Sequence, residues 1–224
     1  MILRIGQMEK DYFAAEFLFF GAEKIVGRMN VRGSLIVSET TIDMELFGNR
    51  YYLCPVSGNP IYAGLSMLDE RETAYRPYNV SKKGKGIQGM IYQVDRKTGK
   101  EDVCAFYQME YAGKWYDLYP VSFESEGELY LLYCGSQQIA QVEKDMVIVD
   151  GQYAYNIYAV DQTAAEIAVL MCAYIYMYCD FKPGQKTNRS VVIYTKITTD
   201  KTLLEKYDPT FKNMIIKGEK KNEE

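Results

Sequence analysis

The amino-acid sequence predicts a single strand-rich domain, mainly β in class, built around one apolar helix. Between Lys24 and Val160, apolar residues alternate with polar ones in short runs that Gly, Pro, Asn or Asp interrupts, a spacing typical of meandering β-structure. From Ala164 to Cys179 the chain is instead almost wholly apolar. No Pro-rich or Ser-rich linker divides the 224 residues, and the 48% apolar composition suffices for a sizeable core. We therefore expect one domain over residues 1–217.

Short alternating runs identify the expected strands. The clearest are Ser34–Ser38, Thr41–Leu46, Gly89–Val94, Leu129–Tyr133 and Asp145–Val149. Turn-forming residues lie between these runs. The 21 tyrosines also suit a sheet, because an aromatic ring packs on the pleated surface while its hydroxyl reaches the rim.

The alternation stops at Asp161, and a helix is predicted from about 164 to 179. Thr163 and Glu166 have the spacing of a capping box, in which the threonine accepts a bond from the N3 amide and the glutamate reaches back. Because the segment Ile167–Cys179 is apolar on every face, the helix must be enclosed by protein or by lipid.

The length of this helix favours a protein core over a membrane. Sixteen helical residues span about 24 Å, which is shorter than the ~30 Å hydrocarbon layer of a bilayer. A transmembrane span is the alternative, and we expect no integral membrane insertion. A second alternative assigns the alternating Tyr174, Tyr176 and Tyr178 to one more strand, but the capping box favours a helix.

Residues 182–217 form an extension after the helix. The pattern predicts a strand at Arg189–Ile197, a short helix at Thr202–Tyr207 and an apolar piece, Phe211–Ile216, that could dock on the domain surface. Residues 218–224 are charged and lack apolar side chains, so we expect a disordered tail.

Composition narrows the possible functions. A net charge of −4 argues against nucleic acid as a partner, because phosphate neutralisation needs a clustered basic surface. The N-terminal residues lack a signal-peptide pattern, which predicts a cytoplasmic protein with five reduced cysteines. The sequence contains no histidine, so serine and cysteine triads that use histidine are excluded, as are histidine-based metal sites. We expect no enzyme activity, cofactor or metal.

Two basic loops are the candidate ligand-binding sites. The first contains Lys82, Lys83 and Lys85, and the second contains Lys182, Lys186 and Arg189. Glycine amides beside these cations could hold a phosphate or an anionic lipid head group, although such a group is more often a solvated turn.

Two further features of the sequence are less informative. Gly84–Gly89 spells GxGxxG, but it lacks the strand before it and the helix after it that dinucleotide binding requires. Trp115 could contact a ligand or a membrane, and we favour a place in the core of a strand.

The order of elements over Leu129–Phe181 resembles a known superfamily. Strands at Leu129–Tyr133, Gln138–Lys144, Met146–Asp150 and Tyr155–Tyr158 precede the apolar helix. This order is similar to that of the tubby C-terminal-like superfamily, which includes phospholipid scramblases and the LURP-one-related proteins. Relatives often end soon after the helix, whereas some forty residues follow it in this chain.

The resemblance implies a specific architecture. It is an α+β fold, mainly β, with a closed and mostly antiparallel β-barrel of about twelve strands around a central hydrophobic helix. Such a barrel accounts for a helix that is apolar on all sides, and closure leaves no exposed sheet edge.

The function that we expect is a non-enzymatic cytoplasmic binding module, peripheral to the membrane where its ligand is a lipid. Its partner would be an anionic phospholipid or phosphoinositide head group, or another protein. The superfamily's binding residues have no matching motif here, so the two basic loops carry this prediction. The alternatives are a small-molecule enzyme that uses carboxylate, tyrosine or lysine groups, and a protein anchored in a membrane by the helix at 164–179.

Overall fold

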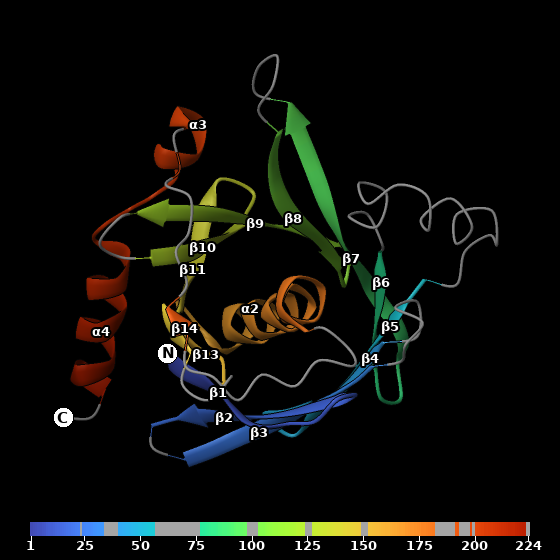
Figure 1. The fold of residues 1–224 in the computed structure, drawn as a ribbon. Helices are drawn as coiled ribbons and strands as arrows, with labels where there is room; N and C mark the ends of the chain where they lie inside the picture. Colours follow the sequence, from blue (N-terminus) through green and yellow to red (C-terminus); the bar gives the residue numbers. More distant parts are fainter. Residues whose placement is uncertain are drawn as a thin grey trace.

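A computed structural model describes residues 1–22, 24–33, 40–56, 77–97, 103–123, 127–148, 152–181, 191–192, 198 and 200–222. Twelve antiparallel strands close into a barrel in the ring order β1-β13-β11-β10-β9-β8-β7-β6-β5-β4-β3-β2 (Figure 1). The strands are β1 (Ile2–Lys10), β2 (Ala14–Gly21), β3 (Lys24–Arg32), β4 (Thr41–Leu46), β5 (Asn49–Pro55), β6 (Tyr78–Lys82), β7 (Gly86–Lys97), β8 (Val103–Tyr111), β9 (Lys114–Phe123), β10 (Gly127–Cys134), β11 (Gln137–Lys144) and β13 (Ala154–Ala159). The predicted mainly β class and the closed antiparallel barrel of twelve strands are thus confirmed.

The alternating pattern sets which face of each strand is buried. On β4, Ile42, Met44 and Leu46 are fully buried, while the residues between them face outward. Ile42 lies opposite the buried Leu53 of β5, so neighbouring strands present their apolar faces together. Two strands that precede the predicted β-region, β1 and β2, complete the ring, because β1 pairs with both β2 and β13.

One end of the barrel carries a set of tight turns. Consecutive strands run in opposite directions, so the β2–β3, β4–β5, β6–β7, β8–β9 and β10–β11 turns lie at the same end. We call it the hairpin end. Strand β13 also finishes there, and the following helix therefore begins there.

Helix α2 (Gln162–Ile175) continues into a π-helical turn, η3 (Tyr176–Asp180). Its N-cap is Asp161, whose carboxylate accepts a 2.7 Å hydrogen bond from the amide of Ala164. The predicted cap at Thr163 was wrong by two residues. The expected capping partner, Glu166, instead accepts hydrogen bonds from β5, so contacts with the barrel outweigh the local motif.

The side chains of α2 and η3 share one apolar core with the strands. The ring of Tyr174 contacts Tyr78 of β6 and Tyr107 of β8 edge-on, and the ring of Tyr176 contacts Phe17 of β2 at 4.6 Å. The helical structure here rules out the alternative strand. Among the described residues, no helix combines the length and the apolar character needed to cross a bilayer.

Two helices that follow η3 in the sequence pack on the outside of the barrel. Helix α3 (Lys201–Leu204) buries Leu203 against Val121 of β9 and Leu131 of β10. Helix α4 (Phe211–Asn222) lies to one side of the barrel in Figure 1, and its Lys212 forms a 2.8 Å ion pair with Glu143 of β11.

Two sequence predictions require correction. The apolar run Asp145–Val149 is not a barrel strand, because its described part forms β12 (Val147–Ile148), which pairs with β14 (Val191–Val192) in a separate small sheet. The tail predicted for residues 218–224 is helical through Asn222, since α4 continues that far. The predicted strand at Ser34–Ser38 and most of the one at Arg189–Ile197 lie outside the described residues.

Candidate functional site

The first basic loop forms the β6–β7 turn at the hairpin end. Lys82 is the last residue of β6, and Lys83 and Lys85 are exposed in the turn. Gly84 and Gly86 both have positive φ angles, of 81° and 69°, which glycine adopts without a steric penalty. The turn leads into a strand, so Gly84–Gly89 lacks the helix that a dinucleotide-binding loop opens.

Beside this turn lies a groove of about 390 Å³ on the outside of the barrel. We call it the Lys83 groove. It is lined by Asp43, Arg50, Tyr51, Tyr52, Ser81, Lys82 and Lys83. Strand register explains the arrangement, because Tyr52 of β5 lies opposite both Asp43 of β4 and Ser81 of β6. The groove therefore runs across three adjacent strands and brings together two of the predicted lysines.

An ion pair occupies one side of the groove. The guanidinium of Arg50 donates two hydrogen bonds to the carboxylate of Asp43, at 2.9 and 2.5 Å. These bonds lower the pKa of Asp43, which is ionised at neutral pH. The pair is exposed to solvent, so Arg50 keeps free donor positions for a second anion.

Lys82 connects the groove to α2 through Tyr51. Its ammonium lies 5.2 Å from the centre of the Tyr51 ring and 3.4 Å from the Tyr51 hydroxyl. That hydroxyl donates a 2.8 Å hydrogen bond to Glu166 of α2. Burial, and then the Glu166 carboxylate, raise the pKa of Tyr51 far above its usual range, so the phenol stays protonated. The inner wall of the groove is thus tied to the first turns of the helix.

The six predicted site residues differ in where they lie relative to the groove and to the described part of the chain. Lys82 and Lys83 line the groove, whereas Lys85 lies further along the same turn. Lys182, Lys186 and Arg189 lie outside the described residues.

Sequence reasoning missed Arg50, Tyr52 and Ser81. The segment 57–76 separates β5 from β6 in the sequence, so no local pattern could pair Tyr52 with Ser81. The pairing of β5 with β6 could have been found by aligning the alternating residues of the two strands that are buried.

The exposure of Trp115 contradicts a further prediction. We expected a strand core residue, but the residue is 50% exposed near the start of β9. The next residue, Tyr116, is the buried one, and successive side chains in a strand point to opposite faces. Trp115 therefore faces outward at the hairpin end.

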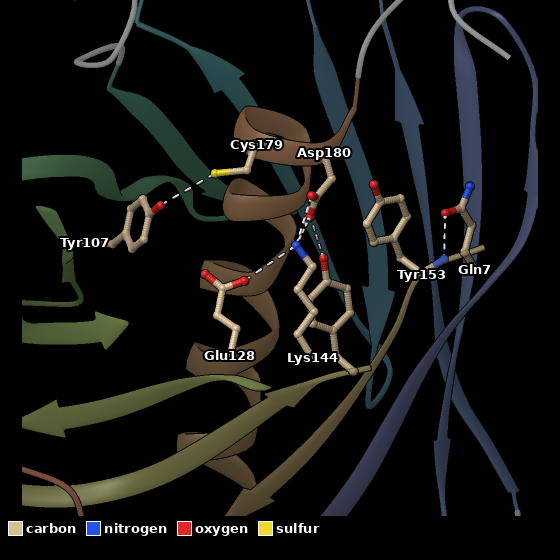
Figure 2. A network of polar contacts seen from close by, with 8 residues as sticks. Gln7, Tyr107, Glu128, Lys144, Tyr153, Cys179 and Asp180 are labelled. Atoms are coloured by element: carbon tan, nitrogen blue, oxygen red, sulfur yellow. Dashed lines mark hydrogen bonds and ion pairs between the residues drawn. The ribbon is translucent and has the colours of Figure 1, made fainter. Parts of the chain in front are cut away.

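A second polar cluster lies at the opposite end of α2 (Figure 2). We call Glu128, Lys144, Tyr155 and Asp180 the Lys144 cluster. Both carboxylate oxygens of Asp180 accept hydrogen bonds of 2.9 Å from Lys144, and the Tyr155 hydroxyl donates to Asp180 at 3.1 Å. Glu128 lies 3.7 Å from the same ammonium. Figure 2 shows Lys144 between the two carboxylates.

The Lys144 cluster anchors η3 to the barrel. Burial alone lowers the pKa of Lys144, but the attraction of Asp180 and Glu128 outweighs it, so the net pKa is raised. A nucleophilic lysine needs the neutral amine, and this lysine keeps its proton. The ion pair joins η3 to β11, and the bond from Tyr155 adds β13.

Other reactive groups are few within the described part of the chain. It contains no group of three or more Cys, Asp or Glu side chains arranged to hold a metal ion. Cys54, Cys134, Cys172 and Cys179 are free thiols. Burial raises the pKa of Cys172 to about 12, so this thiol is protonated at neutral pH.

Comparison with known protein families, with curated proteins and with solved structures found no match to this chain.

Proposed function

We propose that this protein is a non-enzymatic binding module that holds a phosphate-bearing anion in the Lys83 groove. The observation that carries the proposal is the meeting of Lys82, Lys83 and Arg50 in one solvent-open groove. These cations contrast with the acidic balance of the whole chain, whose net charge is −4. Lys85 lies in the turn beside the groove and adds to the local field.

The side chains around the groove suit a phosphate. Arg50 presents a planar fork of donors, and Lys83 provides an exposed charge that can move to meet the anion. Ser81, which also lines the groove, supplies a hydroxyl donor. Asp43 opposes anion binding, but the three cations that line the same groove outnumber it.

We further propose that the barrel has the tubby-like arrangement, with α2 filling its interior. Three observations support this arrangement: the twelve-stranded closure, the direct succession of β13 and α2, and ring contacts from Tyr174 and Tyr176 to three strands spread around the barrel. With the interior filled by apolar side chains, binding falls to the outer surface. We also propose that the protein lies in the cytoplasm and that its partner is not nucleic acid, because its net charge is −4.

Calorimetric titration with soluble inositol hexakisphosphate, alongside flotation with lipid vesicles, tests the anion proposal. One set of vesicles is phosphatidylcholine alone, and the other contains about one third phosphatidylserine. We expect binding to the soluble phosphate, to the anionic vesicles, or to both, and the two arms distinguish a free phosphate from a head group. Failure to bind either probe contradicts the proposal.

Charge variants make the test specific to the groove. Lys83→Gln should weaken binding about fivefold, because a basic residue at an anionic surface contributes about 1 kcal/mol. Asp43→Asn should strengthen binding, because it removes the carboxylate that competes for Arg50. Lys201→Gln, an exposed lysine on α3, is the matched control and should change nothing. Equal effects of Lys83→Gln and Lys201→Gln would assign the binding to net charge alone.

A further inference from the structure

Large apolar side chains are exposed around the Lys83 groove at the hairpin end. Ile87 is 64% exposed, and Tyr52 is 45% exposed. Strand register connects them, because Ser81 of β6 lies opposite Tyr52 of β5 on one side and Ile87 of β7 on the other. The three side chains therefore form a row across neighbouring strands.

Trp115 is a further exposed apolar side chain at the hairpin end. It faces outward on β9, two strands beyond β7, at a separation of about 10 Å across the sheet. Exposed isoleucine and tryptophan cost free energy in water, so their position on adjacent hairpins points to a partner that covers them.

Cations surround these side chains. Lys83 and Lys85 lie in the β6–β7 turn beside Ile87, and Lys114 directly precedes Trp115; all three are exposed. Lysine is depleted from the cores of protein interfaces, where apolar residues instead form a contiguous patch. Single apolar side chains on separate hairpin tips, each beside lysine, suit the boundary between lipid head groups and acyl chains.

We propose that the hairpin end docks on an anionic bilayer surface, with Ile87 inserted between the head groups and Trp115 at the interface. This inference rests on the proposed anion binding, because it makes the phosphate that the groove holds a lipid head group. The lysines provide attraction to the charged surface, and Ile87 provides apolar burial. Tryptophan suits the interface because its ring is apolar and its N–H needs a polar partner.

The decisive experiment is flotation of the full chain with the anionic vesicles, comparing Ile87→Ser with Met8→Ser. Met8 is a matched control, because it is 49% exposed and lies on β1 near the opposite end of the barrel. We expect Ile87→Ser to weaken partitioning about tenfold, the lower limit for burial of an isoleucine side chain. Ile87→Leu should retain binding, and Met8→Ser should leave it unchanged.

Fluorescence gives an independent measurement, because Trp115 is the only tryptophan. Its emission should move to shorter wavelength with anionic vesicles and stay in place with inositol hexakisphosphate. Glu110 lies opposite Trp115 on β8 and is exposed, so it would approach the anionic surface. Glu110→Gln should therefore strengthen vesicle binding about fivefold.

The outcomes separate this inference from the anion proposal. If Lys83→Gln weakens binding while Ile87→Ser behaves like Met8→Ser and the emission does not shift, the groove binds anions and the docking inference is wrong. If the protein binds inositol hexakisphosphate but does not bind vesicles, the docking inference is also wrong, and the ligand of the groove is a soluble anion. If Lys83→Gln and Ile87→Ser both lack effect on vesicles, and the soluble phosphate also fails to bind, both proposals fall.

Discussion

Both ends of α2 contact the barrel through polar groups. These groups are buried at one end and border an open groove at the other. At its C-terminal end, the ion pair of Lys144 and Asp180 is buried, with side chains only 6% and 10% exposed. At its N-terminal end, Glu166 contacts Tyr51, and the adjoining Lys82 borders an open groove. Charges at the first end are paired inside the protein, whereas at the second end Lys82 lines a groove that is open to solvent.

This difference assigns distinct roles to the two ends. A buried charge is tolerated only with a partner, so the Lys144 cluster fixes the position of η3 and leaves no cation for a ligand. Exposed cations cost little to maintain and can exchange partners with an incoming anion. Stability should therefore depend on the Lys144 cluster, and binding on the Lys83 groove.

The largest expected effect comes from breaking the buried ion pair. Lys144→Met should lower the free energy of unfolding by about 3–5 kcal/mol, because it leaves the largely buried Asp180 and the half-buried Glu128 without their cation. Urea unfolding followed by circular dichroism measures the change. Lys212→Met is the matched control, since its ion pair with Glu143 lies on the outer surface and should cost less than about 1 kcal/mol. Similar losses in the two variants would contradict the comparison.

The next effect is expected at the other end of the helix. Tyr51→Phe removes the hydroxyl that donates to Glu166, a bond to a charged acceptor worth about 1.5–3 kcal/mol. Tyr52→Phe is the control, because Tyr52 faces outward on the same strand. Chemical denaturation of both variants should show the loss only for Tyr51→Phe. A loss that reached the value for Lys144→Met would mean that the groove wall is as structural as the buried cluster.

The sequence predicted the strands well because alternation is a local signal, whereas closure into a barrel was implied only by the family resemblance. On β4, every second residue is apolar and buried, and the predicted strand has the observed bounds. The same signal failed at Asp145–Val149, where Val147 is 53% exposed and pairs outside the barrel. An apolar run indicates that burial of the segment is favourable, but it does not identify the strand with which the segment pairs.

The groove was predictable only in part, for the same reason. Lysines beside glycines marked the β6–β7 turn, and both Lys82 and Lys83 line the groove. Arg50 reaches the same groove through pairing of β5 with β4 and β6, which depends on tertiary register. The Lys144 cluster was not predicted at all, because Glu128, Lys144 and Asp180 are distant in sequence and meet only when the barrel closes.

A smaller loss of stability is expected from substitutions at the N-cap of α2, and it distinguishes the observed cap from the predicted one. Asp161→Ala should cost about 1 kcal/mol, because it removes the acceptor for the amide of Ala164. Thr163→Ala should cost almost nothing, and Asp161→Asn should retain most of the stability, since asparagine also caps helices well. Thermal unfolding of the three variants measures this order. The reverse order for Asp161→Ala and Thr163→Ala would restore the capping box.

The smallest expected change in stability belongs to the proposed binding residues themselves. Lys83→Gln combined with Lys85→Gln should alter the free energy of unfolding by less than about 0.5 kcal/mol, because both side chains are exposed in a turn that glycines shape. The same double variant should lose most of its affinity for anionic vesicles. Stability measured by urea unfolding and binding measured by flotation on one preparation would show the two properties separating. A loss of stability as large as the one expected for Tyr51→Phe would mean that these lysines hold the hairpin end together, and the division of roles between the two ends of α2 would fail.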